Sequence, residues 1–75
     1  VEVVSPSDSY VEVARKVRNY LRYGTRLVWV VEPETQTVTV HALDGSQTTL
    51  NIDGVLDGGE VLPGFRLPIR NIFPA

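Results

Sequence analysis

Two neighbouring segments with different β-type patterns constrain the fold most strongly. Residues 27–31 (LVWVV) are continuously apolar and rich in β-branched side chains, which is typical of a strand covered on both faces. Residues 37–43 (TVTVHAL) instead alternate, so that odd- and even-numbered side chains lie on opposite faces. The short polar loop between them predicts an antiparallel hairpin. The turn signal Asp44-Gly45 then predicts a third strand over residues 47–52.

The segment before this meander predicts one strand and one helix. Residues 1–4 (VEVV) are dense in β-branched side chains, and Ser9 with Glu12 fits a capping box for a helix that begins near Tyr10. Apolar side chains then recur at helical spacing and form one face: Tyr10, Val13, Ala14, Val17, Tyr20 and Leu21. Gly24 stands where a left-handed C-terminal cap belongs.

The pattern is weaker in the last third of the chain. Turns at Asp53-Gly54 and at 57–59 flank Val55-Leu56, and residues 60–62 are expected to form a last short strand. The tail carries apolar side chains that we expect to pack onto the core: Phe65, Leu67, Ile69, Ile72 and Phe73. The predicted fold is α+β, a strand, a helix and a three-stranded antiparallel meander, or equally the second half of a mixed α/β sheet.

Composition excludes several classes of protein. The 75 residues contain no cysteine and one histidine, so a disulfide framework, a thiolate zinc site and a histidine metal cluster are excluded. The longest apolar run is far shorter than a membrane helix needs. The sequence shows no basic and apolar leader, so we expect a cytoplasmic protein. A net charge of −2 gives no general attraction to nucleic acid, and any such binding would have to be local.

The first residues lead to an expectation about the length of the protein. Val1 is not a methionine, and residues 1–4 resemble a strand already under way, so we expect residues upstream of it. A processed natural N-terminus is the alternative. An end strand without its neighbour would leave backbone groups unpaired, which predicts a homo-oligomer formed through an open sheet edge.

Basic residues are concentrated on the predicted helix. Arg15, Arg18 and Arg22 recur at three- and four-residue spacings and so share one side of it. Such a stripe can lie along a phosphate backbone, because arginine forks match phosphate oxygens. The alternative is a solvated face with cations placed favourably toward the C-terminal end of the helix dipole.

Glu2 and Lys16 are the other candidate site residues. Glu2 projects from the same strand face as Val4, where it can be an oxygen ligand for Mg²⁺ or an exposed residue at a frayed end. Lys16, the only lysine, either stands over Glu2 or forms a surface pair with Glu12. Tyr20 follows Lys16 one turn later. His41 is expected at an exposed strand position.

In order, these segments resemble a known family. The sequence is similar to the Uma-type putative restriction endonucleases, which belong to the PD-(D/E)xK nuclease-like superfamily. Four segments carry the resemblance: residues 1–8 (VEVVSPSD), Lys16 with Tyr20 and Gly24, residues 27–33 (LVWVVEP), and the ending 56–59 (LDGG) with 62–68 (LPGFRLP). Family members are commonly much longer, so the resemblance implies that residues 1–75 are the C-terminal part of a single restriction-endonuclease-like domain.

The resemblance implies a magnesium site and a nuclease activity for an intact relative. Glu2 matches the family's metal-binding glutamate, and the Val3 backbone carbonyl is a further metal ligand. Val4 stands where the usual motif has lysine, and Lys16 matches the position to which that lysine has moved, with Tyr20 in support. The family's metal-binding aspartate would precede Val1, so nothing in this sequence replaces it.

Three functions therefore stay open at this point. The first is a fragment of an Mg²⁺-dependent endonuclease that hydrolyses DNA, inactive and without bound metal as this chain alone. The second is a non-enzymatic α+β interaction or oligomerisation module. The third is a DNA-binding module that uses only the arginine-bearing helix.

Overall fold

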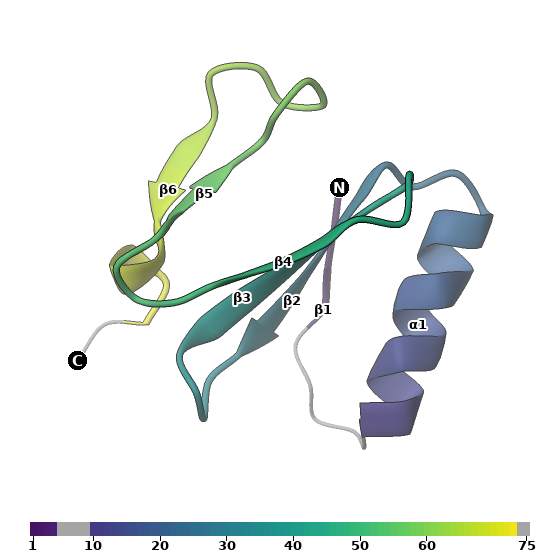
Figure 1. The fold of residues 1–75 in the computed structure, drawn as a ribbon, viewed down its shortest axis with the longest axis horizontal. Coiled ribbons are helices and arrows are strands. Elements are labelled where there is room, and N and C mark those ends of the chain that lie inside the picture. The colour runs from purple at the N-terminus through teal and green to yellow at the C-terminus, as the bar shows by residue number, and fades with distance from the viewer. Residues whose placement is uncertain (5–9, 74–75) are drawn as a thin grey trace.

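The structure is a computed structural model that describes residues 1–4 and 10–73, and it is α+β as predicted (Figure 1). In chain order its elements are β1 (Glu2–Val4), α1 (Tyr10–Arg22), β2 (Leu27–Glu32), β3 (Thr37–Ala42), β4 (Gln47–Leu50), β5 (Val55–Asp57), β6 (Arg66–Pro68) and the short 3₁₀ helix η1 (Ile69–Asn71). The first four strands form one sheet in the order β1-β2-β3-β4, and β5 pairs with β6 in a second. The predicted strand, helix and meander are confirmed.

The register of the first sheet decides which side chains share a face. β1 is parallel to β2, because α1 carries the chain back between them, whereas β2, β3 and β4 are antiparallel. Glu2 pairs with Val28, Val28 with His41, and His41 with Gln47. Since paired residues project to the same face, these four side chains form one row across the sheet on the side of α1.

The end of α1 follows the sequence closely. Gly24 has φ 93°, a left-handed conformation that glycine adopts without steric cost. The Thr25 N–H donates to the Tyr20 carbonyl at 3.0 Å and the Gly24 N–H to the Leu21 carbonyl at 3.1 Å. This pair of bonds is the Schellman motif, which confirms the predicted cap. The predicted loop 5–9, and with it Ser9 of the capping box, lies outside the described residues.

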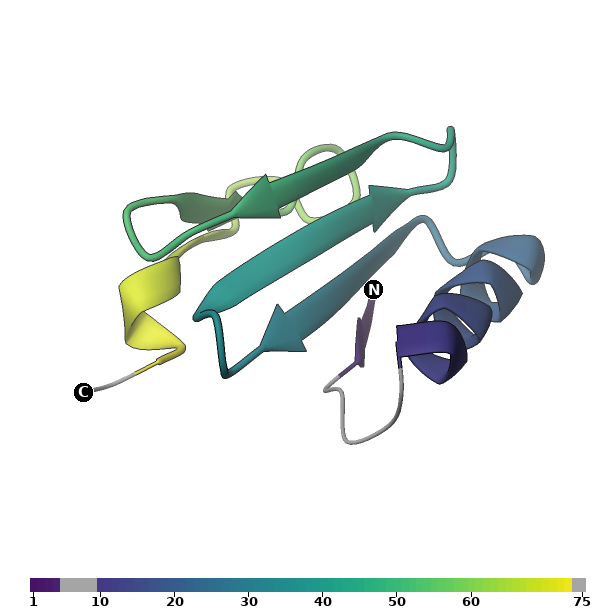
Figure 2. The same ribbon diagram turned by 60° about the horizontal axis from the view of Figure 1, so that its bottom comes forward.

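The core has one cluster on each face of the first sheet. On the α1 side, Val4, Val17, Val28 and Val30 are buried, with Val13 and Leu21 packed against them. On the other side, the second sheet and η1 cover a cluster of Trp29, Val38, Leu56 and Ile69 (Figure 2). Fully burying a side chain of this kind stabilises the fold by about 1.5–3 kcal/mol.

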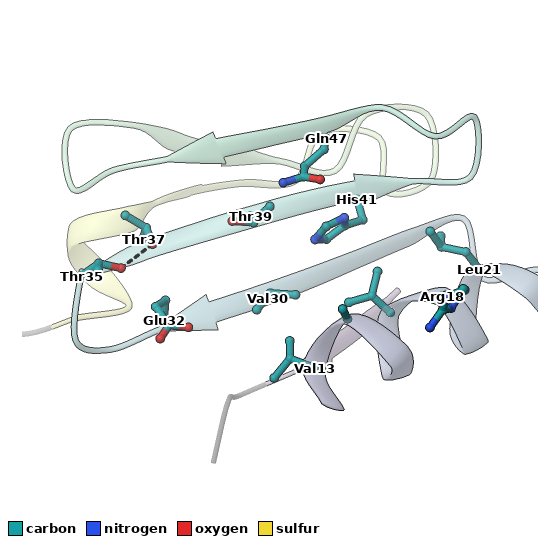
Figure 3. A pocket seen from close by; sticks show the side chains of 12 residues that line it. Val13, Arg18, Leu21, Val30, Glu32, Thr35, Thr37, Thr39, His41 and Gln47 are labelled. Carbon is teal, nitrogen blue, oxygen red and sulfur yellow. Dashed lines mark hydrogen bonds between the residues drawn. The ribbon is translucent and has the colours of Figure 1, made fainter. Parts of the chain in front are cut away.

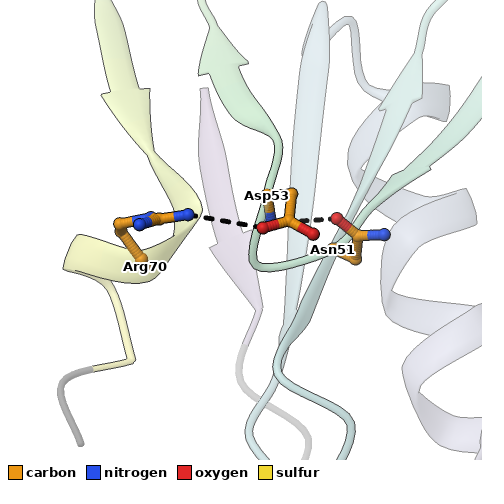
Figure 4. Close-up of polar contacts among 3 residues, drawn as sticks. All are labelled: Asn51, Asp53 and Arg70. Atoms are coloured by element: carbon orange, nitrogen blue, oxygen red, sulfur yellow. Dashed lines mark hydrogen bonds and ion pairs between the residues drawn. The ribbon is translucent and has the colours of Figure 1, made fainter.

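The tail packs onto this second cluster as predicted. Phe65, Leu67, Ile72 and Phe73 are partly buried against it, and Ile69 is fully buried. The Phe65 ring stacks on Trp29 with 5.5 Å between ring centroids. Near η1, the Asp53 N–H donates to Asn51 Oδ1 at 2.9 Å, and Arg70 lies 3.3 Å from the Asp53 carboxylate (Figure 4). That ion pair is largely exposed and contributes about 0–1 kcal/mol.

Two local predictions were wrong. Residues 60–62 form a turn, and the strand that pairs with β5 is β6 instead. The reason is a tight loop after Asp57, whose carboxylate accepts the Gly59 N–H at 2.6 Å while the Leu62 N–H donates to the Gly58 carbonyl. The apolar face of α1 is also narrower than predicted, because Ala14 and Tyr20 lie on its flanks and are exposed.

Candidate functional site

Glu2 lies on the α1 side of the sheet. Glu2 pairs with Val28 of β2, and Val4 follows it on the same face of β1. Both valines are buried beneath α1, whereas Glu2 itself is half-buried. Val3 faces the opposite side and is 58% exposed. The carboxylate therefore sits at the border between the apolar interior and solvent, on a strand that is an edge of the sheet among the described residues.

Lys16 and Tyr20 lie on the flank of α1 toward β1. Successive residues of an α-helix are rotated by about 100°. Val17 faces the sheet, and Ala14 and Arg18 line a groove over β3, so they mark the flank toward that strand. Lys16 and Tyr20 fall on the opposite flank. Lys16 and Tyr20 thus lie on the flank of α1 that faces β1, the strand that carries Glu2.

The predicted arginine stripe lies elsewhere on α1. Arg15, Arg18 and Arg22 are all exposed, and Arg18 also lines the groove over β3. By the rotation of the helix, Arg15 and Arg22 point away from the sheet. The stripe therefore occupies a different flank from Lys16. A nucleic acid bound along it would approach α1 from another direction than one bound at Glu2.

The residues around Glu2 fit a divalent cation only in part. A carboxylate and a backbone carbonyl are the hard oxygen ligands that Mg²⁺ prefers, and Mg²⁺ is commonly bound by one or two carboxylates together with water. However, residues 1–4 and 10–73 contain no group of three histidine, aspartate or glutamate side chains placed to hold a metal. Glu2 and Val3 can therefore supply part of a ligand set that some other group must complete.

A groove between α1 and the exposed half of the sheet was not predicted. It has a volume of about 660 Å³, with apolar side chains of α1 on one side and a polar floor from β3 and β4 (Figure 3). His41 belongs to this floor, so the prediction of an exposed position was wrong: the side chain is half-buried, and burial lowers its pKa. The alternation in residues 37–43 placed His41 on one face, but nothing in the sequence showed that α1 would stand beside it.

Trp29 belongs to the apolar run 27–31, which was predicted to be covered on both faces, and it is 7% exposed. Its indole Nε1 is buried without a hydrogen-bond partner within the described part of the chain. Because the ring lies on the side of the sheet away from α1, it takes no part in the arrangement around Glu2.

α1 has 13 residues, and no helix within the described ranges is long and apolar enough to cross a membrane.

Comparison with known proteins places this fold among nuclease-like proteins. The solved structure of a putative nuclease belonging to DUF820 from Anabaena variabilis ATCC 29413 superposes with a TM-score of 0.80 at 25% sequence identity. The match covers 96% of this chain but 41% of that one, so the chain spans about two fifths of its neighbour's length. The class of protein is therefore a nuclease-like α+β fold.

The sequence comparison gives the particular family. Residues 1–70 match the Uma2 family, described as putative restriction endonuclease. The chain belongs to this family, and the resemblance found from the sequence is confirmed. No curated protein matches the chain.

Proposed function

We propose that residues 1–75 form the C-terminal part of one restriction-endonuclease-like domain, which hydrolyses phosphodiester bonds of DNA with a divalent cation. The observation that carries the proposal is the position of Glu2. In a chain of the Uma2 family, this carboxylate lies at a sheet edge, half-buried, on the side where α1 presents Lys16. The partial coverage of the solved neighbour supports the view that other residues complete the domain.

Each residue around the proposed site has a distinct role. Glu2 and the Val3 carbonyl would hold Mg²⁺, whose chemistry there would be to activate water and to offset charge on the scissile phosphate. Lys16 places a positive charge where negative charge develops on the phosphate. Tyr20, one turn further on the same flank, supports the position of Lys16 by packing beside it. Lys16 is exposed, whereas Glu2 is half-buried, and this partial burial strengthens the electrostatic interactions of the Glu2 carboxylate relative to bulk water.

DNA is the proposed partner, and the arginine stripe is the weaker part of this proposal. Arg15, Arg18 and Arg22 would contact phosphates outside the cleavage site, so their contribution should fall steeply with salt. A regulator that binds DNA through this stripe alone would show the same salt dependence without any need for Glu2. The metal dependence of binding therefore separates the two functions.

The 75-residue chain by itself should not cleave DNA. Its described residues hold no complete set of metal ligands, and a cation held by one carboxylate would be bound weakly. We also propose that the open edge of β1 pairs with another strand, from the same protein or from a second copy, because unpaired edge groups favour such pairing.

The test is a plasmid-nicking assay on the protein as its gene encodes it, with whatever precedes Val1. Glu2→Gln removes the charge with little change of shape. It should lower Mg²⁺-dependent nicking at least about 100-fold, since several kcal/mol of charge stabilisation are lost. Glu34→Gln, on the exposed loop between β2 and β3, is the matched control and should leave the rate unchanged. Equal rates for Glu2→Gln and the parent protein would contradict the proposal, as would robust Mg²⁺-dependent cleavage by the 75-residue chain that Glu2→Ala abolishes.

A further inference from the structure

The last turns of α1 and the turn that follows them form a cationic part of the chain. Residues 13–31 contain five of the seven lysine and arginine residues and no aspartate or glutamate, although the whole chain has a net charge of −2. At the end of α1, Arg22 and Arg26 flank Tyr23 in the sequence, and all three side chains are exposed. Tyr23 is 86% exposed, the largest fraction among the large hydrophobic side chains that the structure describes. These three residues are called the turn cluster below.

The side chains of the turn cluster are unpartnered. Within residues 1–4 and 10–73, none of the three makes a hydrogen bond, an ion pair or a ring contact. Asp44 lies in the neighbouring turn, because the Leu43 N–H donates to the Arg26 carbonyl at 3.0 Å. The Asp44 carboxylate accepts the Ser46 N–H at 2.8 Å instead of pairing with Arg26. Both guanidinium groups of the cluster can therefore bind an anion such as a phosphate.

The backbone holds the turn cluster in a fixed position. The Tyr23 N–H donates to the Asn19 carbonyl at 3.1 Å, so Tyr23 continues the helical backbone of α1. The Schellman motif then closes the helix, and the bond from Leu43 holds Arg26 beside the end of β3. A tyrosine on such a support loses little conformational freedom when it stacks on a flat ligand, because its side chain has few torsion angles.

The turn cluster lies at the same end of the first sheet as Glu2. Because α1 links two parallel strands, it runs opposite to them, and its last turn lies near the starts of both (Figure 1). Arg26 precedes Val28, the pairing partner of Glu2, by two residues, which is at most about 7 Å along the chain. Tyr23 follows Lys16 by seven residues, close to two helical turns, so it lies on the same flank of α1. A nucleic acid with a phosphate at Glu2 and Lys16 would therefore pass Tyr23.

We propose that Tyr23 stacks on an unpaired base of single-stranded DNA, while Arg22 and Arg26 contact the phosphates on either side of that base. The inference rests on the proposed function and names its substrate class, which is DNA with unpaired nucleotides next to the scissile phosphate. Stacking on an aromatic ring requires an open base face, which a paired base inside a duplex does not offer. Arginine alone would bind the phosphates of duplex and single strand alike, so the exposed ring is what favours the single strand.

The test measures binding of a labelled oligothymidine, and of a blunt duplex, to the protein as its gene encodes it. A chelator is present, so that no metal-dependent cleavage takes place. Tyr23→Ala should raise the dissociation constant for the single strand at least about fivefold and that for the duplex less than about twofold, because only stacking is lost. Tyr23→Phe keeps the ring and should bind like the parent protein. Val11→Ala, at 74% exposure near the other end of α1, is the matched control and should also bind like the parent.

A second readout reports stacking itself. A fluorescent base analogue whose emission falls on stacking is placed in the single strand. Binding should quench it with the parent protein and with Tyr23→Phe, and should leave it bright with Tyr23→Ala. Arg26→Gln should weaken binding to both forms of DNA and reduce its salt dependence, because one phosphate contact is lost.

Equal affinity of Tyr23→Ala and the parent protein for the single strand would overturn the inference. So would an equal loss on the duplex, or a loss in Tyr23→Phe as large as in Tyr23→Ala, since neither fits stacking on an open base. If Glu2→Gln abolishes nicking while Tyr23→Ala binds single strands like the parent, only this inference fails. If Tyr23→Ala loses the single-strand affinity but nicking does not depend on Glu2, the base contact is supported and the proposed cleavage site fails.

Discussion

Replacement of Gly58 by alanine tests the loop that joins β5 to β6. An added Cβ would lie 2.5 Å from the Cβ of Leu62, 2.6 Å from its carbonyl oxygen and 3.1 Å from the Cβ of Phe65. The backbone cannot move away easily, because the Gly58 N–H donates to the Phe65 carbonyl and the Gly58 carbonyl accepts the Leu62 N–H. Gly58→Ala must therefore open the loop and displace Phe65.

The expected loss of stability is about 2–4 kcal/mol. Overpacking typically costs about 1–3 kcal/mol, and displacing Phe65 weakens its stacking on Trp29, which contributes about 0.5–1.5 kcal/mol. A chain of this size has a free energy of unfolding of roughly 4–11 kcal/mol, so the loss is a large fraction of the total. Gly59→Ala is the matched control. Its added Cβ meets nothing within 4 Å, and only its φ of +57° costs about 1–2 kcal/mol.

Urea unfolding followed by tryptophan fluorescence measures this difference directly. Trp29 is the only tryptophan and stacks on Phe65, so its emission reports on the loop. With a slope of about 1 kcal/mol per molar urea, the midpoint should fall by about 2–4 M for Gly58→Ala and by about 1–2 M for Gly59→Ala. If Gly58→Ala were no less stable than Gly59→Ala, the close contact with Leu62 would be wrong.

Two further predictions concern the second core cluster and the groove. Ile69→Ala should lower the free energy of unfolding by about 2–5 kcal/mol, because Ile69 is fully buried, whereas Val55→Ala, at 38% exposure, should cost less than about 1.5 kcal/mol; equal losses in urea unfolding would mean that the tail does not pack as described. Burial lowers the pKa of His41 from 6.5, so the unfolded chain takes up this proton first as the pH falls. The free energy of unfolding should therefore decrease as the pH drops below about 6.5, and His41→Gln should remove that part of the slope. An unchanged slope in His41→Gln would show that other groups cause the pH dependence.

The sequence predicted the parts of the fold that local patterns determine. The apolar run of β2 covers five residues and the alternation of β3 covers six, and both patterns depend on which faces of the strands are buried. Gly24 adopts the left-handed backbone conformation that ends the helix, so the sequence predicted the C-terminal end of α1 accurately. In contrast, β6 has three residues, and its position depends on the loop around Gly58 rather than on its own pattern. The position of such a short strand is determined by the strand with which it pairs.

The sequence could predict which residues belong to the candidate site, but not how they are arranged in space. The period of two placed Glu2 on the face of Val4, and the structure shows both on the α1 side. The sequence could not show which flank of α1 lies toward β1, because helical spacing fixes relative directions and not the position of the helix over the sheet. For the same reason the groove and the half-burial of His41 could not be inferred, whereas the separation of the arginine stripe from Lys16 follows from helical spacing alone.

The most direct test of the account is to locate a bound divalent cation by paramagnetic broadening in NMR spectra. Mn²⁺ replaces Mg²⁺ at oxygen-ligand sites and broadens the amide signals of residues close to it. In the protein as its gene encodes it, substoichiometric Mn²⁺ should broaden Glu2 and Val3 first, then Tyr20 across the contact with α1, and Glu2→Gln should abolish the effect. Broadening centred on the exposed carboxylates of Asp53 or Glu60, unchanged in Glu2→Gln, would contradict a metal site at β1.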